Sequence, residues 1–204
     1  TLALRGCPDT KIVIVDECHK KSAILKSWME KRPNTTFIGL SATPWATGMA
    51  EQWTDLVCPV RTQDLIDAGL LSPFRVYAPS HPDLSGVKMK AGDYHEGQLS
   101  EVMGQAVLMA DVVQTWLKLG NWQPTLVFAV DRAHAAKLQT EFASAGVPMG
   151  YCDANVDRIE RKVLFDRMAR GELAGIVNVG TLTTGVDADV RCIVLARPTK
   201  SEML

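Results

Sequence analysis

The chain has 204 residues, 47% of them hydrophobic and 22% charged, which suits one large or two small globular α/β units. A net charge of −1 excludes a basic surface over the whole molecule, so nucleic acid would have to bind a local patch. The five cysteines are scattered without a C-x-x-C pair, which argues against a zinc site or a disulfide framework and favours a reducing cytoplasm.

No stretch of the sequence approaches the ~20 apolar residues of a membrane-spanning helix. Arg5 and Pro8 interrupt any apolar signal region. We therefore expect a cytoplasmic protein with no membrane partner. Leu2 and Leu4 are typical of the end of a helix, and residues 6–10 of a turn that leads into the first strand.

The first predicted strand, 12–15, consists of four β-branched residues, which favour a strand covered on both faces. It ends in adjacent carboxylates, Asp16 and Glu17, at the edge where open α/β sheets bind ligands. One carboxylate could hold Mg²⁺ while its neighbour takes a proton from a water that attacks a terminal phosphate. The alternative is that both acids open the next helix, where they favour its dipole.

A helix is predicted over 20–30, and a second strand over 35–40. The second strand runs into Ser41 and Thr43, whose hydroxyls could hydrogen-bond His19 beyond the first strand. An N-cap or a Ser/Thr turn is the structural alternative. Because two successive strands end in polar groups at the same expected edge, we prefer the functional interpretation.

The middle of the chain is less periodic. It predicts short helices over 51–56 and 62–68, a strand over 73–78 and an irregular connection over 79–98. Lys88 and Lys90 of this connection could contact a phosphate backbone, although we prefer a solvated loop. Trp45 and Trp53 could stack on bases, although core packing is preferred.

Apolar residues at helical spacing predict one long helix over 99–119 that Gly120 ends. The β–α steps that follow predict a parallel sheet with right-handed crossovers. Its strands are expected over 125–130, 148–152, 174–179 and 191–196, and its helices over 132–145 and 156–170. The basic residues of the last helix are nearly balanced by acids, which indicates a solvated, ion-paired face.

A second polar stretch, 178–189, lies between the last two predicted strands. Its glycines allow a ligand close to the backbone, its threonines offer hydroxyls, and its first aspartate could accept a hydrogen bond from a ribose hydroxyl. A polar turn between parallel strands is the alternative. The residues concerned are Gly180, Thr181, Thr183, Gly185 and Asp187.

The sequence V-D-E-C-H at 15–19, followed by L-S-A-T-P at 40–44, resembles motifs II and III of superfamily 2 helicases of the DEAD/DEAH type. Within that family it is similar to bacterial and phage helicases of DNA repair and restriction. Residues 126–129 resemble motif IV and 178–189 resemble motif V. The resemblance implies RecA-like parallel α/β sheets of the P-loop NTPase superfamily, with part of a first lobe over 1–72 and most of a second lobe over 73–204.

The resemblance also implies an enzyme that couples hydrolysis of ATP with Mg²⁺, bound between the two lobes, to movement on nucleic acid, DNA in preference to RNA. Asp16 would bind Mg²⁺ partly through water, and Glu17 would orient the attacking water. His19, Ser41 and Thr43 would couple hydrolysis to strand movement. Motif V would bind the nucleotide through Gly185 and Asp187, and the nucleic-acid backbone through Gly180, Thr181 and Thr183.

The sequence departs from the family pattern in several ways. No G-x-x-x-x-G-K-[ST] P-loop occurs, and the chain stops at Leu204, where the family would continue into motif VI and its arginine fingers. We therefore expect a fragment that alone hydrolyses ATP very poorly, with the P-loop and motif VI segments elsewhere in the same protein. Ala46 and Thr184 stand where relatives often carry an arginine and an acid.

Two other functions fit parts of the sequence. A scaffold derived from a helicase, with an incomplete ATP site, would keep only nucleic-acid or protein docking, and a P-loop in the upstream reading frame would argue against it. A different hydrolase would use Cys18 as nucleophile and His19 as base, but adjacent residues after a strand rarely face each other.

Overall fold

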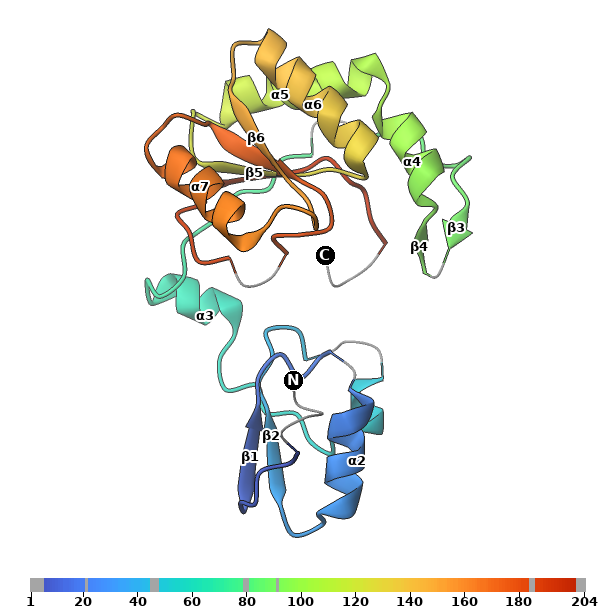
Figure 1. The fold of residues 1–204 in the computed structure, drawn as a ribbon, viewed down its shortest axis with the longest axis vertical. Helices are drawn as coiled ribbons and strands as arrows, with labels where there is room; N and C mark the ends of the chain where they lie inside the picture. The colour runs from blue at the N-terminus through green and yellow to red at the C-terminus, as the bar shows by residue number, and fades with distance from the viewer. Residues whose placement is uncertain are drawn as a thin grey trace. The chain divides into compact units, whose positions relative to one another are not determined.

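A computed structural model of the chain describes residues 6–20, 22–44, 48–78, 81–90, 92–183 and 186–200. It consists of two compact units that divide between Arg75 and Val76 (Figure 1). Each unit has a parallel sheet, which confirms the predicted α/β class. The expected end of a helix at Leu2 and Leu4 lies outside the described residues.

The first unit contains two parallel strands, β1 (Ile12–Val15) and β2 (Thr36–Gly39), joined by helix α2 (Ala23–Lys31). The register aligns Val15 with Gly39, so both strands end at the same edge. Helix α2 begins later than predicted because the Ser22 hydroxyl caps it, accepting a hydrogen bond of 3.3 Å from the Leu25 amide. Its first turn contains no acid, so the alternative in which acids after β1 open this helix is wrong.

The cover on both faces that the composition of β1 favours is present on one face only among the described residues. Val13 is buried, but Ile12 and Ile14 are 54% and 66% exposed. Ile38, which pairs with Ile14, and Leu40 beyond it are exposed as well. Helix α2 lies on one side of the two strands (Figure 1), and none of the described elements covers the other side.

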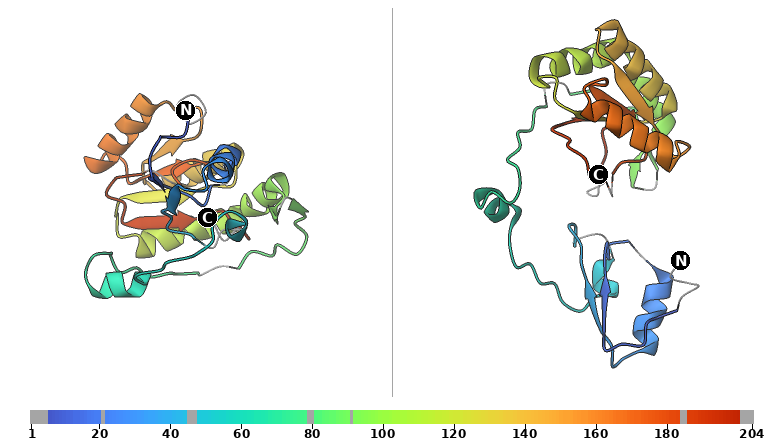
Figure 2. Two further views of the ribbon diagram at one scale, coloured as in Figure 1. Left: turned by 90° about the horizontal axis from the view of Figure 1, so that it is seen from below. Right: turned by 60° about the vertical axis from the view of Figure 1, so that its left-hand side comes forward.

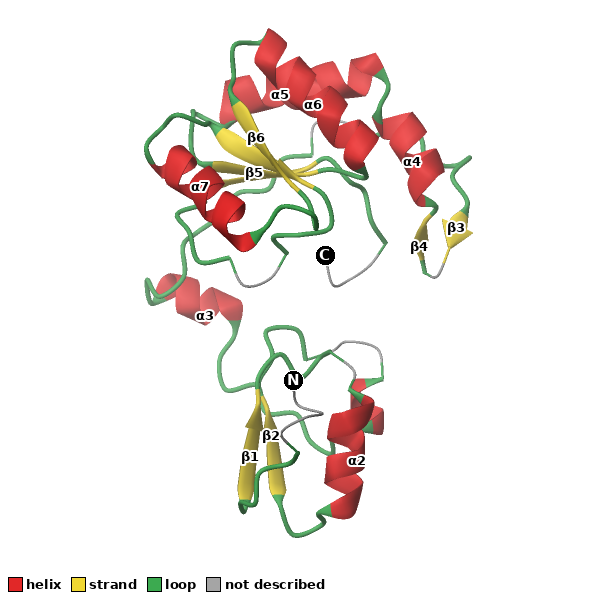
Figure 3. Ribbon diagram, in the orientation of Figure 1, coloured by secondary structure: helices red, strands yellow, loops and turns green. Residues whose placement is uncertain are grey.

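The chain after β2 is less regular than predicted. A 3₁₀-helix, η1 (Met49–Glu51), replaces the helix expected over 51–56, whereas helix α3 (Thr62–Asp67) is confirmed. Residues 73–78 form a loop rather than a strand (Figure 3), since no described strand pairs with them and their apolar side chains are exposed. Trp53 packs over β2, because a Cβ at Gly39 would lie 2.7 Å from its ring. Trp45 lies outside the described residues.

The second unit contains a four-stranded parallel sheet, which confirms the predicted sheet. Its order is β6 (Met149–Cys152), β7 (Gly175–Asn178), β5 (Thr125–Phe128) and β8 (Cys192–Leu195). Helices α5 (Ala106–Leu119) and α6 (Arg132–Ser144) pack on one face, and helix α7 (Arg158–Ala169) packs on the other (Figures 1 and 2).

Caps at the ends of α6 and α7 explain why these elements could be predicted. The Asp131 carboxylate accepts a hydrogen bond of 2.8 Å from the His134 amide, and Asp157 accepts bonds of 2.7 and 2.8 Å from two amides of α7. Gly146 and Gly171 follow these helices with φ of 77° and 74°, the left-handed conformation that glycine tolerates.

The segment before β5 differs from the prediction in two ways. The single helix expected over 99–119 is two helices, α4 (Glu96–Met103) and α5, separated by Gly104 and Gln105. The connection expected to be irregular over 79–98 contains an antiparallel hairpin of β3 (Met89–Lys90) and β4 (Asp93–Tyr94), as well as the start of α4. Among the residues with described structure, no helix has the length and apolar character needed to cross a bilayer.

Candidate functional site

Asp16 and Glu17 lie directly after β1, next to the end of β2. The Leu40 amide donates to the Val15 carbonyl at 2.8 Å, and the Cys18 amide donates to the Leu40 carbonyl at 3.0 Å. The segments that follow β1 and β2 therefore stay hydrogen-bonded to each other beyond the ends of the strands. This pairing brings the exposed carboxylates after β1 to the segment that begins with Ser41.

A tight turn holds the two acids. Glu17 has a φ of 52°, which a residue with a side chain rarely adopts and which costs roughly 1–2 kcal/mol. Asp16 Oδ1 accepts a hydrogen bond of 2.9 Å from the Glu17 amide, which stabilises the turn. Asp16 Oδ2 has no hydrogen-bond partner within the described ranges, so it is available to a ligand.

His19 connects the two strand ends through one ring nitrogen. Its Nδ1 lies 2.9 Å from Ser41 Oγ and 3.3 Å from Glu17 Oε2. The expected contact between His19 and Ser41 is therefore present. Thr43 does not join it through its hydroxyl; its backbone amide donates to Ser41 Oγ at 3.0 Å. The predicted Ser/Thr turn thus coexists with the contact between the strands.

A pocket of about 620 Å³ opens at this edge of the first unit, a size typical of small-molecule sites. Both carboxylates and Ser41 line it, together with an apolar wall formed by Ile38, Gly39, Leu40, Ala42, Val57 and Pro59. The described residues contain no cluster of three or more His, Cys, Asp or Glu that could hold a metal ion. Mg²⁺ needs only one or two carboxylates when phosphates and waters complete its shell, so the free oxygen of Asp16 fits this ion.

Cys18, which lies between Glu17 and His19 in the sequence, is buried and its sulfur lies against Gly39 of β2. Burial raises the pKa of its thiol, and the charges of Asp16 and Glu17 raise it further. A nucleophilic cysteine requires the opposite shift, toward the thiolate. The structure therefore gives no support to a hydrolase with Cys18 as nucleophile.

The described residues of the stretch that resembles motif V follow β7 at the carboxyl edge of the second sheet. The loop is anchored by Leu182, which is buried beneath α7 with a φ of 57°. Gly180 and Thr183 are exposed, whereas the Thr181 hydroxyl contacts Cys152 Sγ at 3.7 Å and is turned into the protein. Asp187 is exposed. Gly185 lies outside the described residues.

A buried carboxylate that the sequence patterns did not predict as a site residue also lies at this edge. Asp153, whose side chain is only 7% exposed, accepts hydrogen bonds from the Asn155 amide and the Tyr151 hydroxyl, both at 2.9 Å. It also lies 2.6 Å from Arg132 Nε. The amide, hydroxyl and guanidinium together hold the pKa of Asp153 below its usual value. The ionised carboxylate thus fixes the guanidinium of Arg132, which is 62% exposed. The sequence signal for this pair is a charged residue that comes directly after a predicted strand.

No protein-family model matches the chain. Over 198 residues, 95% of its length, the chain is 28% identical to a 51.5 kDa protein of Lactococcus phage (isolate 7-9), of which it covers 44%. Over 126 residues, 60% of its length, it is 33% identical to the Saccharomyces cerevisiae protein "Putative ATP-dependent helicase IRC3", of which it covers 18%. The chain thus spans less than half of each relative.

The structure of S. cerevisiae Dbp5 bound to RNA and ADP BeF3 is similar to the whole chain. The TM-score is 0.51 at 15% sequence identity, and the match covers 96% of this chain and 47% of Dbp5. At this identity the likeness concerns the fold alone. It confirms the predicted RecA-like class of the parallel sheets.

Proposed function

We propose that this chain, whose motifs resemble those of superfamily 2 helicases, is part of an ATP-dependent helicase or translocase. Such an enzyme couples hydrolysis of ATP with Mg²⁺ to movement along DNA or RNA. The observation that carries the proposal is the junction after β1 and β2, where two adjacent carboxylates share a pocket with Ser41 and the latter is hydrogen-bonded to His19. The similarity to the protein named "Putative ATP-dependent helicase IRC3" supports the proposal, as do the ADP BeF3 and the RNA bound to Dbp5.

The two carboxylates have different roles in this proposal. Asp16, through its free oxygen, would hold Mg²⁺ partly through water, and the ion would neutralise charge on the phosphate oxygens. Glu17, whose side chain is 46% exposed at the pocket, would orient the attacking water and accept its proton. The turn between them keeps both groups at the same pocket.

His19 and Ser41 would couple this chemistry to movement. In the tautomer that carries a proton on Nδ1, His19 would donate to Glu17 or to Ser41, which lie 3.3 and 2.9 Å from this nitrogen. When Glu17 takes a proton and loses its charge, its attraction for this nitrogen weakens, and the balance moves toward Ser41. Thr43 would respond to the change through the hydrogen bond that its backbone amide donates to Ser41 Oγ. The end of β2 thereby responds to the state of the carboxylate after β1.

The second unit would contribute to ligand binding through motif V. We propose that Asp187 and Gly185 bind the nucleotide, and that Gly180, Thr181 and Thr183 bind the nucleic-acid backbone. The exposure of Gly180 and Thr183 supports this role, whereas the inward turn of the Thr181 hydroxyl leaves its backbone as the group available to a phosphate. We also propose that the first unit is part of one RecA-like lobe and the second unit most of another.

Nucleic-acid-stimulated ATPase activity of the complete gene product tests this function. Replacing the proposed base, Glu17→Gln, should lower turnover by ~10²-fold or more, since a positioned base contributes that much. Glu30→Gln, an exposed acid at the end of α2, is the matched control and should leave turnover unchanged. Normal turnover by a folded Glu17→Gln variant would refute the role of Glu17. Nucleic-acid binding without any ATPase activity in the wild type would indicate the scaffold instead.

A further inference from the structure

The β3–β4 hairpin is fastened to the segment that follows β8, 104 to 107 residues further along the chain. Asp93 Oδ2 accepts hydrogen bonds from the Thr199 hydroxyl at 2.9 Å and from Arg197 Nη2 at 3.4 Å. Asp93 Oδ1 accepts from the amides of Lys200 at 3.0 Å and Tyr94 at 2.8 Å. The Lys200 ammonium also lies 5.4 Å from the centre of the Tyr94 ring, within the range of a cation–π contact.

Asp93 is ionised at neutral pH and acts as the anchor of this cluster. Its partial burial raises the pKa of the carboxyl, but the amides of Lys200 and Tyr94, the Thr199 hydroxyl and the charge of Arg197 outweigh this effect. The pKa therefore lies below its usual value. The hairpin and the segment after β8 consequently form one surface at neutral pH.

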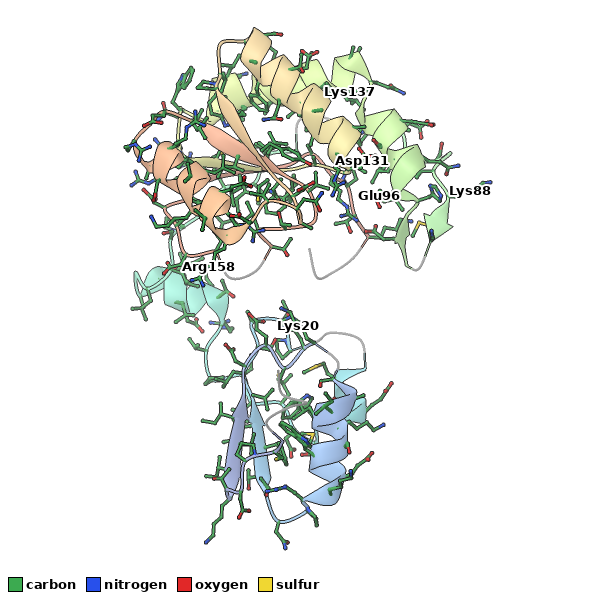
Figure 4. The ribbon with its side chains drawn as sticks, viewed as in Figure 1. Lys20, Lys88, Glu96, Asp131, Lys137 and Arg158 are labelled. Carbon is green, nitrogen blue, oxygen red and sulfur yellow. The ribbon has the colours of Figure 1, made fainter. Side chains whose placement is uncertain are left out.

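Four cations gather on this surface. On the hairpin, Lys90 lies opposite Asp93 in the strand register. The His95 amide donates to the Lys88 carbonyl at 2.7 Å, so the backbone pairing continues to Lys88. Residues two apart on a strand project to the same face, so both lysines lie on one side of the hairpin. Figure 4 shows Lys88 at the hairpin, beside α4. We call Lys88, Lys90, Arg197 and Lys200 the hairpin surface.

The hairpin surface carries an excess of positive charge. Lys88 and Lys90 are exposed, and their side chains make no ion pair with any residue in the described part of the chain. Three basic residues in and directly after α7 differ, because Lys162, Arg167 and Arg170 are matched by Asp166 and Glu172 at 2.6 to 3.3 Å. In a protein with a net charge of −1, the hairpin surface is a local basic patch.

The hairpin surface also lies in line with the proposed nucleic-acid residues. Arg197 and Lys200 leave the carboxyl end of β8, the same edge at which Gly180 follows β7 and Arg132 follows β5. Because β8 is the outermost strand beside β5, the hairpin surface extends this edge outward. A ligand that crosses the edge from β7 to β8 would reach it.

We propose that the hairpin surface binds the phosphate backbone of a nucleic-acid strand that crosses this edge. The proposal rests on the proposed function and adds a binding surface outside the motif residues. Lysine ammonium groups on flexible stems bind phosphates as point charges, independently of base sequence. An acidic peptide would share the charge, but peptide recognition also uses pockets for side chains, whereas the hairpin lysines flank only the exposed Met89.

The test is the salt dependence of oligonucleotide binding by the 204-residue chain. Fluorescence anisotropy with labelled 20-nucleotide oligo(dT) and oligo(rU) would compare wild type with the double variant Lys88→Gln, Lys90→Gln. Each lost phosphate contact on a single strand should lower the slope of log Kd against log salt by about 0.7, or about 1.4 for the pair. When salt rises from 50 to 200 mM, the fold-increase in Kd should therefore be roughly seven times smaller for the variant than for wild type.

The matched control removes two exposed lysines elsewhere, Lys26→Gln in α2 and Lys118→Gln in α5, and should keep the slope of wild type. An unchanged slope in the hairpin variant, or an equal fall in the control, would overturn the proposal. The proposal would also be overturned if the wild-type chain bound neither oligonucleotide at 50 mM salt. A further contrary result would be that the wild type binds polyglutamate more tightly than the oligonucleotides and that the hairpin variant loses this binding. The ATPase test of Glu17 decides the hydrolytic function and the salt dependence decides the binding surface, so failure of one proposal can be told from failure of the other.

Discussion

The hydroxyl of Ser41 takes part in two hydrogen bonds, and the one with His19 joins the ends of β1 and β2. His19 Nδ1 lies 2.9 Å from it, and the Thr43 amide donates to it at 3.0 Å. One part-buried hydrogen bond contributes about 0.5–1.5 kcal/mol, which corresponds to a factor of roughly 2 to 13. If Ser41 couples hydrolysis to nucleic acid, its loss should lower the stimulation of ATPase activity by nucleic acid by this factor and leave the affinity for nucleotide unchanged.

We therefore predict that Ser41→Ala lowers the stimulation of ATPase activity by nucleic acid about 3- to 10-fold in the complete gene product. The Kd for a fluorescent ATP analogue should change by less than about twofold, because the hydrogen bonds of Asp16 are unaffected. Ser41→Thr should restore the stimulation, and Ser144→Ala, at an exposed hydroxyl at the end of α6, serves as the control. Full stimulation in Ser41→Ala would contradict the coupling role.

His134 is the most deeply buried histidine of the described residues, with 1% exposure. Its Nδ1 accepts a hydrogen bond of 3.2 Å from the Val130 amide, which requires that nitrogen to be unprotonated. Burial lowers the pKa of His134 from 6.5 to about 4. Since the folded state resists protonation, the stability that the neutral ring contributes is complete above pH 6.5 and is lost as the pH falls toward 4.

We predict that the second unit loses about 2 kcal/mol of unfolding free energy between pH 7.5 and pH 5.0 through this histidine. Urea unfolding at the two pH values measures the loss, and His134→Asn isolates it from that of the carboxylates. The variant should be less stable at pH 7.5 because it replaces a buried ring, but it should lose little further stability on acidification. An equal loss in variant and wild type would show that His134 does not titrate in this way.

At the scale of elements, much of the second sheet could be predicted because its helices α6 and α7 have local signals at both ends. Asp131 and Asp157 cap α6 and α7, and Gly146 and Gly171 follow them with positive φ. Such signals depend on neighbours a few residues away, which the sequence displays directly. The contact between His19 and Ser41 could be expected for a related reason, since adjacent parallel strands end at one edge.

The elements that could not be predicted depend on distant neighbours. The β-branched residues of β1 indicate a strand that prefers cover, but not whether the described chain supplies it. Residues 73–78 have the composition of a strand and find no partner among the described strands. The apolar period continues through α4 and α5, so it hides the break at Gly104. Asp93 and Arg197, or Asp153 and Arg132, meet only because of the tertiary arrangement.

At the scale of the whole molecule, the two units differ in how much apolar surface they bury. The second unit has three clusters of buried hydrophobic residues on α4 to α7 and the sheet. In the described part of the first unit, the buried hydrophobic residues are Val13, Cys18 and Leu25. Because burial of apolar surface is the main source of stability, the first unit should open at a much lower free energy than the second.

We predict that amide hydrogen exchange in β1 and β2 is at least ~100-fold faster than in β5 and β7, a difference of about 3 kcal/mol in opening free energy. Exchange followed by mass spectrometry, on peptides that contain 12–15 and 36–39 against 125–128 and 175–178, measures it. The two pairs, β1 with β2 and β5 with β7, are both parallel and equal in length, so their hydrogen-bond patterns match. A difference in their exchange rates would therefore report on burial. Equal protection would mean that the units unfold as one cooperative structure, and that the exposed isoleucines of β1 do not weaken it.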